Sequence, residues 1–441
     1  MSPNLMQSRF SAGLPSARLL TVVAALMLGA PFNLPAQKSS SPASDVYLAR
    51  AKRILATTPL IDGHNDLPWR IREDSIARGN VDAYDLSKHT PGHTDLDRLK
   101  AGMVGAQFWS VYTPGDWRDS GYARIQLEQI DIARRVIARY PDRLALALSA
   151  NDIRREFRQG KLASLLGIEG GHAIENSLGA LRAYYDLGVR YMTLTHNVTL
   201  DWADAALDSA RHGGLTPFGD SVVREMNRLG MLVDLAHVSP GTMSDVLNVT
   251  RAPVIFSHSG ARALVDVPRN VPDSILRRVT TNGGIVMVPF VTGFVSPDVM
   301  RYDASSRPII TDLQAKYGKD TAAITREINQ WRAAHPEPRA TLSQVADQID
   351  YVRNVAGVDH VGIGSDFDGI TEVVQGLEDV SKFPNLFAEL ARRGWSDADL
   401  RKLAGENLLR VFDQAEAVAK RLQAGRQISA LPRTRSADRS Q

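Results

Sequence analysis

The sequence predicts an α/β fold, a (β/α)8 barrel of the TIM type with a helical insertion after the seventh strand. Eight short apolar runs recur along the 441 residues, and each has the length of a buried strand. Helical patterns separate most of these runs, and such alternation is typical of right-handed βαβ units around a parallel sheet. Eight such units are the number that closes a barrel.

Cap residues mark two of the helices between the strands. Before the fifth strand, a helix opens near Phe218 and Gly230 ends it. After that strand, Ser239 supplies an N-cap and Pro240 takes the first helical position. The eight strands are expected at 58–63, 104–110, 163–168, 189–195, 231–236, 253–257, 284–290 and 360–365.

One region, from residue 296 to about 340, exceeds the minimal barrel pattern. Ile324, Ile328 and Trp331 recur at helical spacing, which predicts a helix within 319–334 that stops before Pro336. Because the insertion follows a barrel strand, it belongs at the end of the barrel where catalytic sites of this fold lie. It is either a lid over the substrate or a peripheral packing helix.

The N-terminus has the pattern of a signal peptide. Arg9 and Arg18 precede the apolar run 19–28, which is short for a membrane span. An uncleaved anchor is the alternative reading. No other segment is long and apolar enough to cross a bilayer, so the mature form should lack an integral membrane span and be exported, either periplasmic or secreted. The expected divisions are a signal peptide at 1–36, a linker at 37–50, the barrel at 51–417 and a basic, disordered tail at 418–441.

Charge and cysteine content exclude several classes of function. The net charge of +3 includes +2 from residues 1–36 and +5 from residues 418–441, which leaves about −4 for the body. No basic face is implied, so a nucleic-acid partner is not expected. The chain has no cysteine, so disulfides, thiolate nucleophiles and cysteine-ligated zinc are excluded. Any metal must be held by His, Asp or Glu.

Residues of metal-ligand type gather where the candidate strands end. His64 and Asp66 follow the first strand, Glu169 the third, and His237 and His258 the fifth and sixth. Because the strand ends of a barrel converge on one axis, we expect these five side chains to meet. A single histidine is more often a hydrogen-bonded structural residue, but four of the ten histidines fall at predicted strand ends. That clustering indicates a metal site.

The ligand types favour Zn²⁺, with Mn²⁺ and Co²⁺ as alternatives. Glu169 has two oxygens and can bridge two ions, so the set predicts two metals per chain. Two ions about 3.5–4 Å apart lower the pKa of a bridging water and polarise a carbonyl. The expected chemistry is metal-assisted hydrolysis.

Four further residues are candidates for roles around the metals. Asp366 ends the eighth strand, where a carboxylate can take a proton from water and pass it to a leaving amine. His196 ends the fourth strand and can hydrogen-bond an oxygen that gains charge. Arg269 lies in a proline-braced loop that suits capture of a carboxylate. His172 is either a supporting residue behind the ligands or purely structural.

The motifs resemble those of the membrane (renal-type) dipeptidases, zinc peptidases with an amidohydrolase-like barrel. The resemblance extends from about Ala56 to Ala417. The matching motifs are IDGHNDL at 61–67, GIEGGH at 167–172, YMTLTH at 191–196, WAD at 202–204, RNVPD at 269–273, GIGSDFDG at 362–369, GLEDVSK at 376–382 and ENLLRVF at 406–412.

The resemblance implies a role for each site residue. His64 and Asp66 would hold one zinc, His237 and His258 the other, and Glu169 would bridge them. This partition of ligands comes from the family alone. Asp366 would be the acid/base, while His196 would contact the scissile carbonyl oxygen and Arg269 the substrate's C-terminal carboxylate.

The activity implied by the resemblance is hydrolysis of dipeptides to amino acids. C-terminal D-residues are accepted in the family, some members open β-lactams, and homodimers are common. Two other functions are compatible with the residues. One is another metal-dependent amidohydrolase that acts on N-acyl amino acids, lactones, β-lactams or phosphotriesters. The other is a barrel that binds peptides without cleaving them, which the complete ligand set and Asp366 disfavour.

Overall fold

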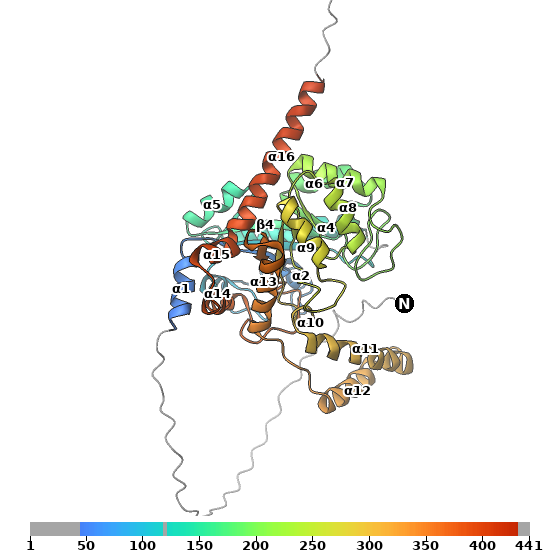
Figure 1. Cartoon of the computed structure of the whole chain (residues 1–441). Coiled ribbons are helices and arrows are strands. Elements are labelled where there is room, and N and C mark those ends of the chain that lie inside the picture. The colour runs from blue at the N-terminus through green and yellow to red at the C-terminus, as the bar shows by residue number, and fades with distance from the viewer. Residues whose placement is uncertain (1–44, 118–120, 431–441) are drawn as a thin grey trace, which may run out of the picture. The chain divides into compact units, whose positions relative to one another are not determined.

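The computed structural model describes residues 45–117 and 121–430 (Figure 1). These residues belong to one compact unit that begins at Ser44. The expected signal peptide and most of the expected linker lie outside the described residues. Among the helices of the described segments, none has both the length and the apolar character needed to cross a membrane.

The strands form one parallel sheet, and its closure confirms the predicted barrel. The sheet order is β2-β1-β9-β8-β7-β6-β5-β4-β3, and an additional pairing of β2 with β4 closes eight strands into a ring. The strands are β1 (Leu60–Asn65), β2 (Val104–Tyr112), β3 (Leu144–Leu146), β4 (Leu162–Glu169), β5 (Val189–Thr193), β6 (Leu232–Asp234), β7 (Ile255–Phe256), β8 (Ile285–Val288) and β9 (Val361–Ile363).

Each of the eight predicted strands has a counterpart, and β3 is an additional short strand that the sequence analysis did not predict. Ala163 of β4 pairs with Ala106 of β2 and also with Ala145 of β3. Because a strand has only two edges, β3 must pair with the same edge of β4 as β5 does. β3 pairs with the first residues of β4, and β5 pairs with the last ones. Its three residues are too few to produce a distinct strand pattern.

Helices surround the barrel in the alternating order that the sequence predicts. The cap residues are confirmed, because Gly230 ends α7 with a left-handed backbone and Ser239 accepts a hydrogen bond from the N–H of Thr242 at the start of α8. The helices are α1 (Val46–Leu55), α2 (Leu67–Arg72), α3 (Leu96–Ala101), α4 (Tyr122–Arg139), α5 (Ala150–Arg158), α6 (Leu178–Asp186), α7 (Pro217–Leu229), α8 (Pro240–Val249), α9 (Asp273–Asn282), α10 (Thr292–Val295), α11 (Pro297–Tyr317), α12 (Thr321–Ala334), α13 (Leu342–Ala356), α14 (Phe383–Arg392), α15 (Asp397–Arg401) and α16 (Asn407–Ala430).

The insertion is a hairpin of two helices, α11 and α12, which lie side by side and join the barrel through α10 (Figure 1). The predicted helix at 319–334 corresponds to α12, whereas α11 was not predicted. Ile310, Ile324 and Ile328 form a small apolar core between the two helices. The ring of Tyr302 packs on Trp331 with centroids 5.4 Å apart. The hairpin therefore carries packing of its own, separate from the barrel core.

The boundaries predicted for the barrel along the sequence differ from the structure on both sides. Residues 46–50 were expected in a linker, but they form the start of α1, whose N-terminus is capped by Asp45. The tail was expected to be disordered from residue 418, but α16 continues to Ala430. Ala415, Val418 and Leu422 recur at helical spacing and join the barrel's apolar packing, which explains why the helix continues. Residues 431–441 lie outside the described part.

Candidate metal centre

The five predicted metal ligands meet at the C-terminal ends of the barrel strands. His64 is the second-last residue of β1 and Asp66 directly follows that strand, while Glu169 is the last residue of β4. His237 and His258 follow β6 and β7 within three residues. All five side chains are buried. Parallel strands end at the same rim, so residues far apart in sequence lie side by side there.

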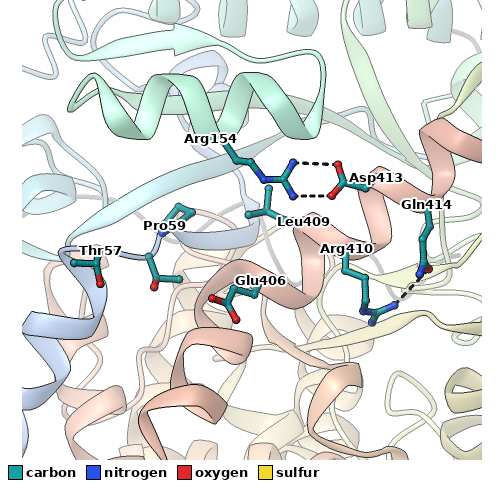
Figure 2. Close-up of a pocket in the computed structure, with 9 residues that line it drawn as sticks. Thr57, Pro59, Arg154, Glu406, Leu409, Arg410, Asp413 and Gln414 are labelled. Carbon is teal, nitrogen blue, oxygen red and sulfur yellow. Dashed lines mark hydrogen bonds and ion pairs between the residues drawn. The ribbon is translucent and has the colours of Figure 1, made fainter.

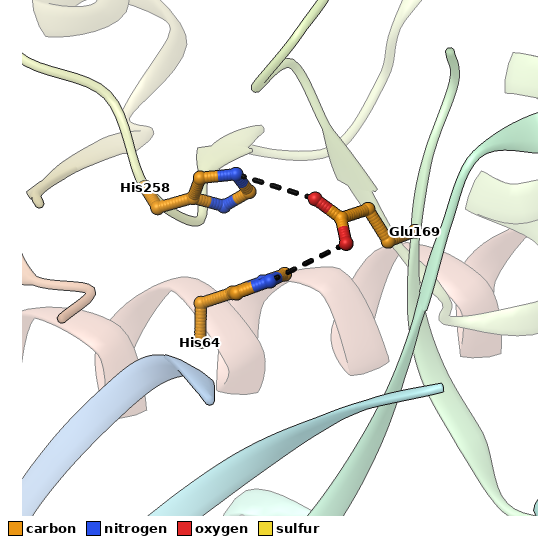
Figure 3. Close-up of side chains that lie close together, drawn as sticks. All are labelled: His64, Glu169 and His258. Atoms are coloured by element: carbon orange, nitrogen blue, oxygen red, sulfur yellow. Dashed lines mark ion pairs between the residues drawn. The ribbon is translucent and has the colours of Figure 1, made fainter. Parts of the chain in front are cut away.

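Glu169 lies among the candidate ligands, and its two oxygens face different histidines. Oε2 is 3.6 Å from Nε2 of His64. Oε1 is 2.9 Å from Nε2 of His237 and 3.5 Å from Nε2 of His258. Asp66 lies beside His64, with Oδ2 at 3.2 Å from Nε2 of His64. Figure 3 shows His258 facing one oxygen of the Glu169 carboxylate and His64 facing the other.

Several nitrogen and oxygen atoms converge here in a way that fits a cation. Nε2 of His237 and Nε2 of His258 are 2.9 Å apart. The contact is an N–H···N hydrogen bond if one ring carries hydrogen on Nε2, and if both nitrogens carry lone pairs it is a repulsion that a cation close to both would relieve. Nε2 of His64 and Oδ1 of Asp66 are buried without a hydrogen-bond partner. A buried polar atom without a partner is costly, and coordination of a metal removes that cost.

The electrostatics agree with neutral His237 and His258 beside an ionised carboxylate. Burial lowers the pKa of His237 and the pKa of His258 well below the usual range. Neutral imidazole is the form that binds a metal. Burial also opposes the charged form of His64, but Tyr191, Asp66 and Glu169 outweigh burial and raise the pKa of His64 well above its usual range. Burial raises the pKa of Glu169, but the neighbouring histidines outweigh it and bring that pKa well below the usual range.

Asp366 and His196 border the same cluster. Oδ1 of Asp366 is 4.0 Å from Nε2 of His64, and burial raises the pKa of Asp366 well above its usual value. Nε2 of His196 is 3.9 Å from Oε1 of Glu169, and burial lowers the pKa of His196 to about 4. Asp366 and His237 both have a left-handed backbone, with φ of 67° and 66°. Such backbone is uncommon outside glycine and often marks functional sites.

Arg269 is a buried cation that faces this cluster. Its side chain is 2% exposed, and its Nη1 is buried without a hydrogen-bond partner. Burial lowers the pKa of Arg269 to about 10, while the negative charges of Asp366 and Glu169 act in the opposite direction. The ring of Phe294, in α10, lies 5.4 Å from the guanidinium carbon. A guanidinium in this position suits an incoming anionic group.

His172 supports a neighbouring loop. Its Nε2 donates a hydrogen bond of 2.7 Å to the carbonyl of Thr113, just beyond β2. Its ring packs on Tyr122, at the start of α4, with centroids 4.8 Å apart. These contacts tie the loop after β4 to the loop after β2. They favour the structural reading of His172 over a role directly behind a metal ligand.

An aromatic wall, which the sequence analysis did not identify, lies beside the cluster. Tyr112, the last residue of β2, packs edge-on against His196 with centroids 4.8 Å apart. Trp69 packs against Tyr112 at 4.9 Å, and Trp117 against Trp69 at 5.8 Å. The wall offers apolar surface to a bound molecule. The position of Tyr112 at a strand end was the signal that could have revealed it.

A separate hollow of about 410 Å³ lies at the opposite end of the barrel (Figure 2). Thr58 and Pro59, which line it, precede β1, so this hollow belongs to the N-terminal end of the strands. Arg154 and Asp413 cross it in a two-pronged ion pair with distances of 3.0 and 2.6 Å. Arg154 and Asp413 are therefore already paired with each other, and the hollow contains none of the candidate site residues.

The closed parallel barrel, with His, Asp and Glu at its strand ends, defines a metal-dependent hydrolase by class. The chain belongs to the membrane dipeptidases, peptidase family M19, because the sequence model of that family matches residues 48–426. It is therefore a metallopeptidase that hydrolyses peptide bonds.

Solved structures agree with the family. The probable dipeptidase PvdM from Pseudomonas aeruginosa is 26% identical with a TM-score of 0.72, and the match covers 85% of this chain and 100% of that one. The dipeptidase AC, a metallopeptidase of family M19, is 25% identical with a TM-score of 0.68, covering 81% and 99%. A metallopeptidase from Rhodobacter sphaeroides shares the fold at 24% identity and a TM-score of 0.66, covering 81% and 99%.

Proposed function

We propose that this chain is a binuclear zinc dipeptidase. The observation that carries the proposal is the position of Glu169, whose Oε2 faces His64 and whose Oε1 faces His237 and His258. His64 and Asp66 would hold one ion, and His237 and His258 the other. Bound zinc ions supply Lewis acidity and lower the pKa of a coordinated water.

The residues around the ligands would bind the dipeptide and move the proton. Asp366 would take a proton from the attacking water and deliver it to the leaving amine. Its burial and its position 4.0 Å from His64 support that role. His196 would donate a hydrogen bond to the scissile carbonyl oxygen.

Arg269 and the aromatic wall would orient the substrate. Arg269 has a buried Nη1 without a partner, which suits the C-terminal carboxylate of a dipeptide. The wall of Trp69, Tyr112 and Trp117 would contact an apolar substrate side chain. The two recognition elements together select a short substrate with a free carboxylate.

We further propose that the enzyme is exported, that it accepts C-terminal D-residues and that it forms a homodimer. The arginines and apolar run within residues 1–36 support export to the periplasm or the medium. The resemblance to the dipeptidase family supports the other two properties. Hydrolysis of L-Ala-D-Ala tests the first of them, and light scattering tests the second.

The decisive experiment measures zinc content and hydrolysis of glycyl-dehydrophenylalanine on one preparation of residues 37–441. We expect about two zinc ions per chain, with activity lost on chelation and restored by Zn²⁺. Asp366→Asn should keep the metal while turnover falls by orders of magnitude. Two metals without dipeptide turnover would move the proposal to another amide or ester substrate. A folded protein without tightly bound metal would overturn it.

A further inference from the structure

A buried carboxylate, Asp234, lies inside the barrel behind one of the metal-site histidines. It ends β6 and is 0% exposed. Its Oδ1 accepts two backbone N–H groups, from Ser257 at 2.8 Å and from Ala236 at 3.1 Å. Its Oδ2 accepts two hydroxyls, from Ser257 at 2.6 Å and from Thr193. As a carboxylate, Asp234 has only acceptor atoms, so all four of these groups must donate to it.

These contacts determine where the hydroxyl proton of Ser257 points. A serine hydroxyl has one proton, and here Asp234 takes it. Oγ of Ser257 is also 2.8 Å from Nδ1 of His258. With its own proton directed at Asp234, this oxygen can only accept, so Nδ1 of His258 must carry the hydrogen. The lone pair of His258 is then on Nε2, the nitrogen that faces Glu169 and His237.

The other two histidines of the cluster have different partners. Nδ1 of His64 is 2.8 Å from the hydroxyl of Tyr191, and Nδ1 of His237 is 3.0 Å from Oδ1 of Asn197. Both partners are neutral oxygens, whereas a carboxylate lies behind His258 through Ser257. A carboxylate behind a ligating imidazole fixes the ring's orientation and raises its basicity.

We propose that Asp234 and Ser257 are positioning residues that hold His258 with a hydrogen on Nδ1 and a free lone pair on Nε2, and thereby strengthen divalent-metal binding. This inference rests on the proposed metal centre and deepens it. Thr193 donates to the same oxygen of Asp234 but contacts none of the metal-site histidines through a hydrogen bond that the structure describes. It therefore provides a control within the same polar group.

The proposal makes a specific prediction for Asp234→Asn. The two backbone N–H groups at Oδ1 cannot reverse, so the asparagine must place its oxygen there. Its NH₂ group then points at the two hydroxyls and donates to Ser257. The serine proton is released and turns toward Nδ1 of His258, so the hydrogen of His258 moves to Nε2. That form of the ring cannot coordinate a metal through Nε2.

The test compares Ser257→Ala, Asp234→Asn and Thr193→Val with the wild-type full chain. Zn²⁺ affinity is measured by competition with a chromophoric chelator, and folding by circular dichroism and thermal unfolding. We expect Ser257→Ala to weaken zinc binding about 10- to 100-fold, Asp234→Asn to weaken it at least as much, and Thr193→Val to leave it within about threefold. Unchanged affinity in folded Ser257→Ala would overturn the proposal, as would an equal loss in Thr193→Val.

A spectroscopic measurement separates positioning from a loss of stability. In metal-free protein labelled with ¹⁵N-histidine, the His258 signals are identified by their absence in His258→Gln. We expect Nδ1 of His258 to carry hydrogen in the wild type and in Thr193→Val, and to lose it in Asp234→Asn. An Nδ1 without hydrogen in the wild type would contradict the proposed chain of hydrogen bonds from Asp234 through Ser257 to His258, which we call the relay. If Asp234→Asn does not fold, Ser257→Ala and the wild-type spectrum decide the question.

The controls distinguish failure of this inference from failure of the proposed function. Wild-type protein that binds no zinc would overturn the metal centre itself, and the relay with it. Wild-type protein that binds two zinc ions, with Ser257→Ala binding them equally well, would overturn the relay alone.

Discussion

Single residues in the site combine burial with an unused bonding capacity. Arg269 is 2% exposed, and its Nη1 has no hydrogen-bond partner. Nε2 of His64 and Oδ1 of Asp66 are also buried without a hydrogen-bond partner. Native proteins satisfy most of their buried polar groups, so a cluster of such exceptions indicates a place where something binds.

Arg269→Ala should raise KM for dipeptides more than tenfold. The substitution removes the buried cation that suits the substrate's carboxylate, and a tenfold loss corresponds to about 1.4 kcal/mol. Steady-state kinetics with a dipeptide series measures it. Arg262→Ala is the control, because Arg262 lies in the same segment but pairs with Asp266 at the surface. An unchanged KM in Arg269→Ala would remove this residue from substrate binding.

Gly167→Ala should destabilise the barrel and weaken metal binding. Gly167 of β4 lies opposite Tyr191 of β5, and a Cβ there would be 2.0 Å from Cζ of the tyrosine ring. The ring must move, which costs about 1–3 kcal/mol and disturbs its contact with His64. Chemical denaturation and zinc titration measure the two effects. Gly179→Ala, in helix α6, should not destabilise the protein, and equal behaviour of the two variants would refute the steric argument.

Helices agreed with the prediction where a long apolar pattern marked them. They differed from it where the pattern was short or the segment was rich in charge. Helix α12 was expected because three apolar residues recur at helical spacing within it. In α16, the positive charge beyond residue 418 suggested a frayed end, yet Val418 and Ala419 are buried in the structure. Net charge describes the solvent-facing side of a helix and says little about its packed side.

The hairpin of α11 and α12 should unfold independently of the barrel. Ile328 is buried in the small core between the two helices, so Ile328→Ala should loosen the hairpin by about 2–5 kcal/mol. Limited proteolysis should then cut within residues 297–340, while the thermal unfolding of the barrel stays unchanged. Asn329→Ala, at an exposed neighbouring position, is the control. A matching fall in the barrel's own stability would show that the hairpin is part of the main core.

Kinetics of the Ile328→Ala variant also separate the two roles that the sequence left open for the insertion. A lid contributes to closure over the substrate, so loosening it lowers kcat/KM. A peripheral packing helix leaves kcat/KM unchanged. The link through α10 is direct, because Phe294 contacts Arg269 and its carbonyl accepts hydrogen bonds from Asn270 and Gln348.

At the scale of the whole molecule, the candidate site ties together strands from distant parts of the chain. The five proposed ligands extend from residue 64 to residue 258 and come from β1, β4, β6 and β7. An unfolded chain cannot hold them together, so a metal that binds them binds the folded state preferentially.

Zn²⁺ should therefore stabilise the fold in a concentration-dependent manner. Free metal at about 100 times its dissociation constant adds about 2.7 kcal/mol per site to the free energy of unfolding. Differential scanning calorimetry at several zinc concentrations, and after chelation, should show Tm rising with zinc. Mg²⁺ at the same concentration is the control, because imidazole-rich sites disfavour it. A Tm that does not change with zinc concentration would contradict a metal site built from these strands.

The barrel, the order of its strands along the chain and the identities of the proposed ligands could all be predicted from the sequence. This was possible because a buried strand leaves an apolar run, and because chemically distinctive residues interrupt that run at its end. Asp62 and Asp234 are also carboxylates inside apolar runs, but their hydroxyl partners, Ser365 and Ser257, lie just beyond the ends of other strands. Three features could be recognised only in the folded chain: which residues each oxygen of Glu169 faces, which histidine has a carboxylate behind it, and that Trp69, Tyr112 and Trp117 form one wall. These features are contacts across strands, and closure of the barrel brings together residues whose spacing along the chain says nothing about their distance.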